Sequence, residues 1–185
     1  MDIRLNREIK AYCPDFVPVR QLLRGLGAAF VETREQVDFF YHLPATSDEQ
    51  GTRRLKLRIE NGKTQLIYYY DRQETGARTS QSRLWEVRDP QVQAVLEAAL
   101  GVRVVIRKQR ELWRKDNVIF NLDTVEGVGQ VFEVEVLAQE GADVEAQVAE
   151  NRRRFGSYLG PDISGSNEDL MGGGDVQPGG AVPVG

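Results

Sequence analysis

The chain has 185 residues, which is enough for one domain with a hydrophobic core of its own. Its 24 basic and 28 acidic residues give a net charge of −4, which argues against non-specific binding to nucleic acid or to a membrane surface. No apolar run approaches the roughly 18 residues of a membrane span, and the start lacks the apolar region of a signal peptide. We therefore expect neither a transmembrane helix nor secretion.

The chain has a single cysteine and a single histidine, Cys13 and His42. One cysteine excludes an internal disulfide and suits the reducing cytoplasm, where we expect the protein to reside. One thiol and one imidazole make a zinc site improbable, and nothing marks His42 as a partner that would activate Cys13. A metal would therefore be held by oxygen ligands, which favours Mg²⁺, Mn²⁺ or Ca²⁺.

Most of the chain alternates apolar and polar residues with the period of two that is typical of β-strands. The strongest hairpin signal is Asn61-Gly62, which lies between two such stretches. The predicted strands cover, in chain order, about 3–11, 37–43, 53–60, 64–71, 82–88, 103–114, 118–124 and 130–137. Apolar residues at helical spacing predict helices over about 16–26, 90–100 and 143–158.

About eight mostly sequential strands with few helices predict an α+β protein built on one antiparallel barrel or strongly curved sheet. We expect this domain to occupy residues 1–170. The remaining segment, 171–185, has six glycines and two prolines in fifteen residues, which predicts a disordered tail.

Basic side chains recur on one face of two predicted strands. In RRLKLRIE (53–60), Lys56 and Arg58 alternate with apolar residues, and Lys108 and Arg110 follow the same pattern in the strand that spans 103–114. Like charges two residues apart on a strand repel each other unless something neutralises them. Each pair alone is compatible with a solvated face, but the repetition on separate strands favours a common ligand.

An acidic counterpart lies in VFEVEV (131–136), where Glu133 and Glu135 share one face and apolar residues share the other. A solvated outer face is the alternative explanation for this alternation. If these faces all point inward, the interior cannot be an apolar core, because burying an unpaired charge costs several kcal/mol. A water-filled tunnel would suit them, with carboxylates holding a divalent metal and lysine and arginine binding phosphate oxygens.

Five blocks of sequence occur together and resemble a known family. They are NREIK (6–10), QVDFFY (36–41), RRLKLRIENGKTQLIYY (53–69), RKQRELW (107–113) and NLDTVEGVGQVFEVEV (121–136). Over about residues 3–170 the chain resembles the CYTH family, the triphosphate tunnel metalloenzymes, especially the class IV adenylyl cyclases. This resemblance implies an eight-stranded antiparallel tunnel that holds Mg²⁺ or Mn²⁺ through carboxylates and a triphosphate through basic side chains.

Carried across motif by motif, the resemblance implies two sets of site residues and leaves the catalytic residue unassigned. The implied metal ligands are Glu8, Asp123, Glu133 and Glu135. The implied phosphate-binding residues are Lys10, Lys56, Arg58, Lys108 and Arg110.

The chain departs from the family pattern at three positions of the expected site. Asn6 stands where the family signature has a glutamate, which removes a negative charge from the expected metal site. Weaker metal affinity, or one metal in place of two, would follow. Asn121 stands where a histidine is common, and Tyr69 lies near the place where phosphatase members often carry a lysine.

The resemblance implies an enzyme that acts on a triphosphate, and several functions stay open. The first is a class IV-like cyclase that converts ATP to cyclic AMP and pyrophosphate. The second is a triphosphatase that hydrolyses inorganic, thiamine or nucleoside triphosphate, and the third is a polyphosphate- or nucleotide-binding module with little turnover. A structural protein with solvated charged faces is the fourth. We expect a triphosphate-containing small molecule (ATP or inorganic triphosphate) as ligand, no DNA, RNA or membrane partner, and a monomer or homodimer.

Overall fold

The computed structural model describes residues 4–44, 52–74, 77–89, 91–163 and 171. The expected tail, apart from Met171, lies outside these residues. The strands are β1 (Arg4–Tyr12), β2 (Ala29–Tyr41), β3 (Thr52–Glu60), β4 (Lys63–Glu74), β5 (Ala77–Val87), β6 (Val102–Lys115), β7 (Val118–Val125) and β8 (Gly129–Leu137). The helices are α1 (Phe16–Gly25), α2 (Gln91–Leu100) and α3 (Val144–Phe155), and a 3₁₀ turn, Gly156–Tyr158, follows α3.

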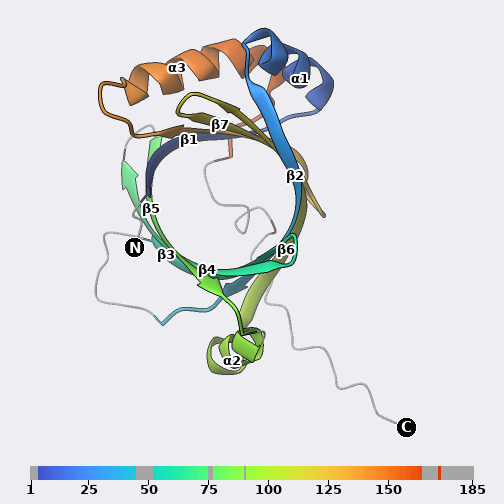
Figure 1. The fold of residues 1–185 in the computed structure, drawn as a ribbon, viewed down its shortest axis with the longest axis vertical. Helices are drawn as coiled ribbons and strands as arrows, with labels where there is room; N and C mark the ends of the chain where they lie inside the picture. Colours follow the sequence, from blue (N-terminus) through green and yellow to red (C-terminus); the bar gives the residue numbers. More distant parts are fainter. Residues whose placement is uncertain (1–3, 45–51, 75–76, 90, 164–170, 172–185) are drawn as a thin grey trace.

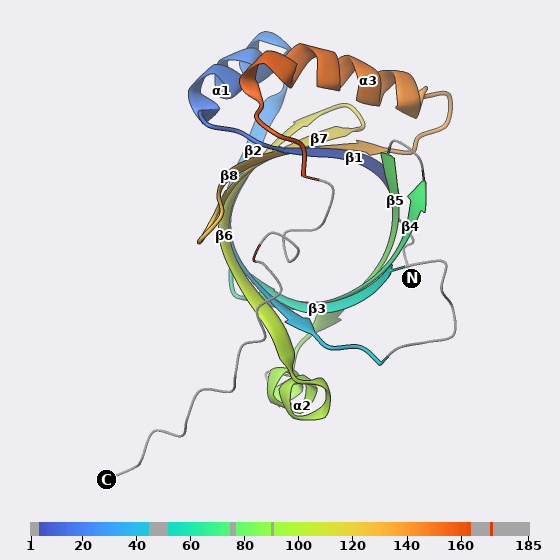
Figure 2. The same cartoon turned by 180° about the vertical axis from the view of Figure 1, so that it is seen from behind.

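All eight strands pair in antiparallel fashion, in the order β1-β5-β4-β3-β2-β6-β7-β8. β1 pairs with β5 along one edge and with β8 along the other, so the ring of strands closes into a barrel (Figures 1 and 2). The expected α+β class, with an eight-stranded antiparallel sheet and flanking helices, is confirmed.

The hairpin predicted at Asn61-Gly62 joins β3 to β4. Both residues have positive φ, 47° at Asn61 and 77° at Gly62, and Glu60 pairs directly with Lys63. Two consecutive positive φ values match the right-handed twist of the flanking strands, and asparagine and glycine adopt them at low cost. This local signal sets the register that carries Lys56 and Arg58.

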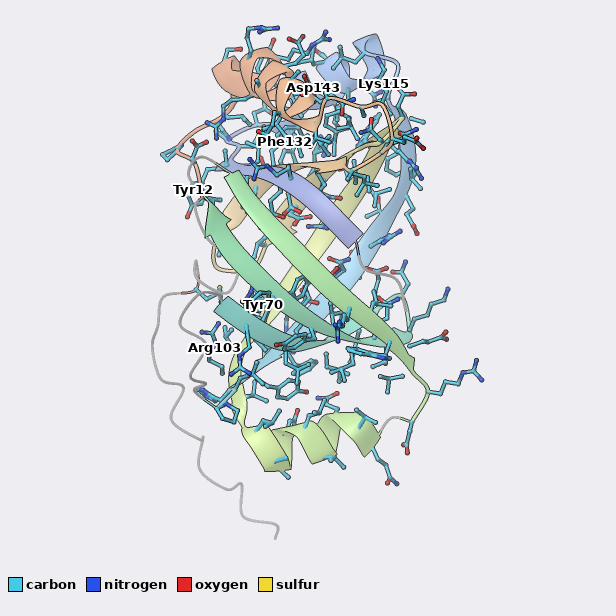
Figure 3. All side chains as sticks on the ribbon, turned by 90° about the vertical axis from the view of Figure 1, so that its left-hand side faces the viewer. Tyr12, Tyr70, Arg103, Lys115, Phe132 and Asp143 are labelled. Atoms are coloured by element: carbon cyan, nitrogen blue, oxygen red, sulfur yellow. The ribbon has the colours of Figure 1, made fainter. Side chains whose placement is uncertain are left out.

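Two helices cover one side of the barrel, and α2 lies on the opposite side (Figure 1). α1 and α3 pack on the outward-facing apolar residues of β1, β7 and β8. Phe132 lies beneath these helices (Figure 3), with its ring centroid 4.8 Å from that of Phe155 on α3. The apolar half of the alternation in β8 is therefore explained by this outer core, which leaves the acidic half to face the barrel interior.

The largest difference from the predicted elements is at β2, which begins eight residues before the expected 37–43. Its first half is mostly exposed and shows no apolar alternation, so local pattern does not reveal it. Pairing with β6, from Ala29 opposite Arg114 onward, holds this half in the sheet. β5 likewise begins at Ala77 rather than at 82.

One end of the barrel interior is apolar. Phe40, Ile106, Val125 and Val131 form a buried cluster there, joined by Ile163 from the segment that follows α3. The backbone N–H of Ile163 donates to the carbonyl of Lys10 at 2.9 Å, which fixes this segment against β1. Within the described residues no helix has the length and apolar character needed to cross a membrane.

Candidate functional site

The barrel interior holds an unusual number of buried charged side chains. Seven are at most 8% exposed: Asp38, Arg54, Lys56, Lys108, Arg110, Asp123 and Glu133. Charged residues are rarely buried to this extent unless they are paired. Their partners therefore define the site.

The first group, which we call the β3 clamp, consists of Lys56 and Arg58 on β3 with Asp38 on β2. Arg58 donates through Nε to Asp38 Oδ1 at 2.7 Å and through Nη2 to Oδ2 at 2.8 Å. Lys56 Nζ donates to the same Oδ2 at 3.0 Å. Asp38 and Arg58 are direct cross-strand partners, so the register of β2 against β3 creates the contact.

The second group, the β6 clamp, repeats this arrangement with Lys108 and Arg110 on β6 and Asp123 on β7. Arg110 donates to both oxygens of Asp123 at 2.6 Å, and Lys108 Nζ donates to Oδ2 at 2.8 Å. Asp123 is fully buried and again lies directly across from its arginine. The structure thus places this expected metal ligand as the counter-ion of two cations.

Because β2 pairs with β6, the two clamps line neighbouring parts of the barrel wall. Each aspartate engages the same two arginine nitrogens, Nε and Nη2, and therefore fixes the plane of the guanidinium group. Within the clamps four cations share two aspartates, an excess of two positive charges, and Arg110 also lies 3.6 Å from Glu133 on β8. Such a fixed array of buried cations suits an anion that carries several charges.

The two clamp lysines have lowered pKa values. Burial lowers the pKa of Lys56 to about 8, with a contribution from Arg58, although Asp38 opposes the shift. Burial and Arg110 lower the pKa of Lys108 to about 8 in the same way. Burial raises the pKa of Asp38, but Lys56 and Arg58 lower it by more, so this carboxylate stays ionised.

The acidic wall lies on β8, next to β1. Glu133 is paired with Lys10, whose Nζ is 3.1 Å from Oε2, and Arg110 Nη2 is 3.6 Å from the same oxygen. Burial raises the pKa of Glu133, but Lys10 and Arg110 hold it well below its usual range. Burial and the neighbouring Glu133 raise the pKa of Glu135 to about 8. At neutral pH one carboxylate is therefore charged and the other holds a proton.

The predicted site residues come together only in part. Glu133 and Glu135 share a hydrogen bond, and Glu8 lies opposite Glu135 in the register of β1 with β8. As they stand, no three acidic, histidine or cysteine side chains in the described part of the chain are grouped closely enough to hold a metal ion. Asn6 lies opposite Leu137, but its side chain is outside the described residues.

The donor set nevertheless suits a hard divalent ion. Its ligand atoms are all carboxylate oxygens, which Mg²⁺ and Mn²⁺ prefer. Burial and, after it, the neighbouring Glu133 raise the pKa of Glu135, so a cation bound at these two carboxylates would favour the charged form of both. Glu133 and Glu135 would hold the ion, with Glu8 as the nearest third carboxylate in the strand register.

Three residues of the site were not in the predicted set: Asp38, Arg54 and Tyr69. Lys56 Nζ lies 5.1 Å from the centroid of the Tyr69 ring, and the Arg54 guanidinium lies at the same distance. These contacts stabilise the basic wall and direct it inward. Alternation along β2 and β4 puts Asp38 and Tyr69 on the inward face, but it does not show which strand each one meets.

The structure defines a class of protein, a closed antiparallel barrel whose interior carries fixed cations on one wall and carboxylates on another. Comparison with known proteins assigns the chain to one family. The CYTH domain family matches residues 5–165, and the chain therefore belongs to the CYTH family.

Individual proteins resemble the chain in sequence or in fold. A Methanocaldococcus jannaschii protein, named as a candidate adenylate cyclase, is 26% identical over 130 residues, which cover 69% of this chain and 74% of that protein. A solved structure from Pyrococcus horikoshii superposes with a TM-score of 0.72 at 24% identity, over 89% of this chain and 98% of the other. A Hippeastrum protein, described as a candidate adenylyl cyclase with a dominant triphosphatase activity, has a TM-score of 0.63 at 18% identity, over 95% and 98% of the two chains.

Proposed function

We propose that this protein is a divalent-metal-dependent enzyme that acts on a triphosphate, and that its reaction is the conversion of ATP to cyclic AMP and pyrophosphate. The observation that carries the proposal is the pair of clamps, which hold two lysines and two arginines inside one closed barrel. A chain of phosphates is the anion whose length and charge match several fixed cations. Membership of the CYTH family, together with relatives named as cyclases, supports the cyclase reaction.

In this proposal the clamps act mainly by binding and orienting the phosphates. Asp38 and Asp123 hold their arginines in place before the substrate arrives, so little ordering remains at the moment of reaction. The bound ion would supply Lewis-acid stabilisation of phosphoryl oxygens, held by Glu133 and Glu135 with Glu8 nearby. Lys10, paired with Glu133, would lie where the acidic and basic walls meet.

The cyclase reaction requires the ribose 3′-oxygen to approach the α-phosphorus. Its bond to phosphorus forms as the bond to the bridging oxygen breaks, the 3′-hydroxyl gives up its proton, and pyrophosphate leaves. Negative charge grows on the departing pyrophosphate, and cations of the clamps are placed to stabilise it. Binding the β- and γ-phosphates at the clamps would direct the α-phosphate toward the acidic wall.

Hydrolysis of a triphosphate is the second candidate, favoured by the triphosphatase activity reported for the Hippeastrum relative. The same cations would stabilise a water attack on the terminal phosphorus. Purified protein incubated with ATP or with tripolyphosphate, each with Mg²⁺ or Mn²⁺, separates the two. Cyclic AMP with pyrophosphate identifies the cyclase, and orthophosphate identifies the phosphatase. Metal-dependent binding without product would support a binding module, and no binding would exclude both reactions.

Three further expectations remain proposals. We propose that residues 1–170 form the functional domain, that the protein resides in the cytoplasm, and that its partner is a triphosphate-containing small molecule rather than DNA or RNA. The monomer and the homodimer are both compatible with the described residues.

Replacing Arg58 with alanine should weaken the binding of tripolyphosphate about 10- to 100-fold. A charge-assisted contact of this kind contributes roughly 1.5–3 kcal/mol. Isothermal titration calorimetry of the metal-free protein measures the effect. Arg107→Ala is the matched control, because Arg107 lies beside Lys108 on β6 but is exposed on the outer face. Equal losses in the two variants would indicate general positive charge rather than a phosphate site.

The affinity for tripolyphosphate should fall as the pH rises above about 8, where Lys56 and Lys108 lose their protons in the ligand-free protein. Each neutral lysine must regain a proton when the anion binds, which weakens binding up to about tenfold per pH unit. Calorimetry in buffers of different ionisation enthalpy should detect this proton uptake. Lys56→Arg keeps its charge at these pH values and should make the affinity fall less steeply with pH. If the affinity of this variant depends on pH as steeply as that of the wild type, the role given to Lys56 is contradicted.

A further inference from the structure

Asn121 on β7 has an uncommon hydrogen-bonding state. The residue is 1% exposed, and its Nδ2 donates to Glu135 Oε1 at 2.8 Å. Its carbonyl oxygen, Oδ1, is buried and receives no hydrogen bond from any described residue. A buried acceptor without a partner costs about 1–3 kcal/mol, so an unfilled acceptor at this place calls for a ligand.

The surroundings of Oδ1 determine what kind of ligand fits. Asn121 lies directly across from Glu133 in the sheet and holds Glu135 through its own amide N–H. In the structure the amide N–H points to Glu135 and Oδ1 is left open, and once a bound cation keeps Glu135 ionised, the opposite orientation would place the amide carbonyl against a carboxylate. The open acceptor therefore belongs to a side chain that binds one glutamate and lies across from another, and such a group of oxygens favours a cation over a phosphate.

A second buried amide with an open oxygen, that of Gln36, has different surroundings from Asn121. Gln36 on β2 is 2% exposed, and its Oε1 is also without a hydrogen bond from the described residues, while its Nε2 donates to Glu60. Gln36, however, lies across from Lys108, and Arg34 binds Glu60 at 3.1 Å. Gln36 therefore contacts a single carboxylate, which Arg34 already pairs with, whereas Asn121 binds one glutamate and lies across from a second.

We propose that Oδ1 of Asn121 is an oxygen ligand of the divalent cation held by Glu133 and Glu135, an inference that rests on the proposed metal dependence. Amide carbonyl oxygens are ordinary ligands of hard divalent ions. The same side chain would orient Glu135 through Nδ2 and fill one further position of the ion through Oδ1. It would add an oxygen ligand without adding charge to an already crowded pair of carboxylates.

The test replaces the oxygen with sulfur. In Asn121→Cys, the dissociation constant of Mn²⁺, measured by electron paramagnetic resonance without nucleotide, should rise about 10- to 100-fold. Cd²⁺ should bind more tightly to this variant than to the wild type, because thiolate prefers soft ions, and should give a thiolate-to-cadmium absorption band in the ultraviolet. The wild type controls for Cys13, which is buried, and Gln36→Cys is the matched variant at another open amide.

The outcomes separate this inference from the proposed function. If the wild type binds Mn²⁺ and Asn121→Cys binds it equally well with no cadmium band, Asn121 is not a ligand and only the inference fails. If the wild type binds no Mn²⁺, both the inference and the proposed metal dependence fail. Should the cysteine variant melt below the assay temperature, Asn121→His replaces it. Nitrogen coupling to Mn²⁺ in pulsed resonance supports the proposal, and its absence with Mn²⁺ bound overturns it.

Discussion

Replacing Asp38 with asparagine should lower the free energy of unfolding of the ligand-free protein by about 3–5 kcal/mol, the usual effect of removing one partner of a buried ion pair. Asp38 is 3% exposed and is the shared counter-ion of Lys56 and Arg58. Asparagine keeps the shape but leaves two buried cations without their counter-ion. The melting temperature should fall by roughly 10 °C, since about 2–4 °C corresponds to each kcal/mol in a domain of this size.

A ligand should reverse much of this loss. Tripolyphosphate supplies negative charge to the same two cations, so it should raise the melting temperature of Asp38→Asn by more than that of the wild type. Glu150→Gln is the matched control, because Glu150 pairs with arginines on the exposed face of α3. Exposed pairs contribute about 0–1 kcal/mol, so this control should hardly change stability. Equal melting curves for Asp38→Asn and the wild type would contradict the β3 clamp as a buried charge network.

Replacing Glu133 or Glu135 with glutamine should reduce metal-dependent turnover at least about 100-fold. Loss of residues that merely support metal ligands already costs 10- to 100-fold, and loss of a ligand should cost no less. Turnover as a function of Mn²⁺ concentration measures the effect, with the substrate that the wild type proves to use. If either variant keeps wild-type turnover and metal dependence, the carboxylate that it lacks is not a metal ligand.

The two variants should differ in stability. Glu135 has a pKa of about 8 and holds a proton at neutral pH in the ligand-free protein, so glutamine resembles the state already present. Its unfolding free energy should change by less than about 1 kcal/mol. Glu133 is charged and lies 3.1 Å from the Lys10 ammonium, so glutamine removes one partner of a buried ion pair and should cost about 3 kcal/mol. Chemical denaturation at pH 7 measures both values, and equal losses would contradict the different charge states assigned to them.

Some of the site follows from local sequence alone. The period of two along a strand places Lys56 with Arg58, and Glu133 with Glu135, on common faces, whatever the strands pair with. Asn61-Gly62 fixes the β3–β4 hairpin because few other residues adopt two consecutive positive φ values. The charge on these faces also argues against an ordinary apolar core. These features predicted the barrel strands that carry the cations and the acidic wall.

The partners of those residues depend on pairings between distant segments. Asp38 meets Arg58 because β2 pairs with β3 in one particular register, and Asp123 meets Arg110 through the register of β6 with β7. A shift of one residue would turn each aspartate to the outer face. The family resemblance implied that Asp123 is a metal ligand, which stays a prediction, but its contact with Arg110 and the whole role of Asp38 could not be read from the sequence, because both depend on which side chains the strand register brings together.

The burial of the charged side chains also depends on pairings between distant segments. The sequence shows that lysines and carboxylates share a face, but only the closed barrel removes them from water and thereby shifts the pKa values of Lys56, Lys108 and Glu135 to about 8. The first half of β2 is a second feature that local sequence does not predict. Its exposed residues lack alternation, and only pairing with β6 makes them a strand. Local periodicity determined which side chains face inward together. The tertiary structure decided their partners, because cross-strand register and desolvation arise only when distant segments meet.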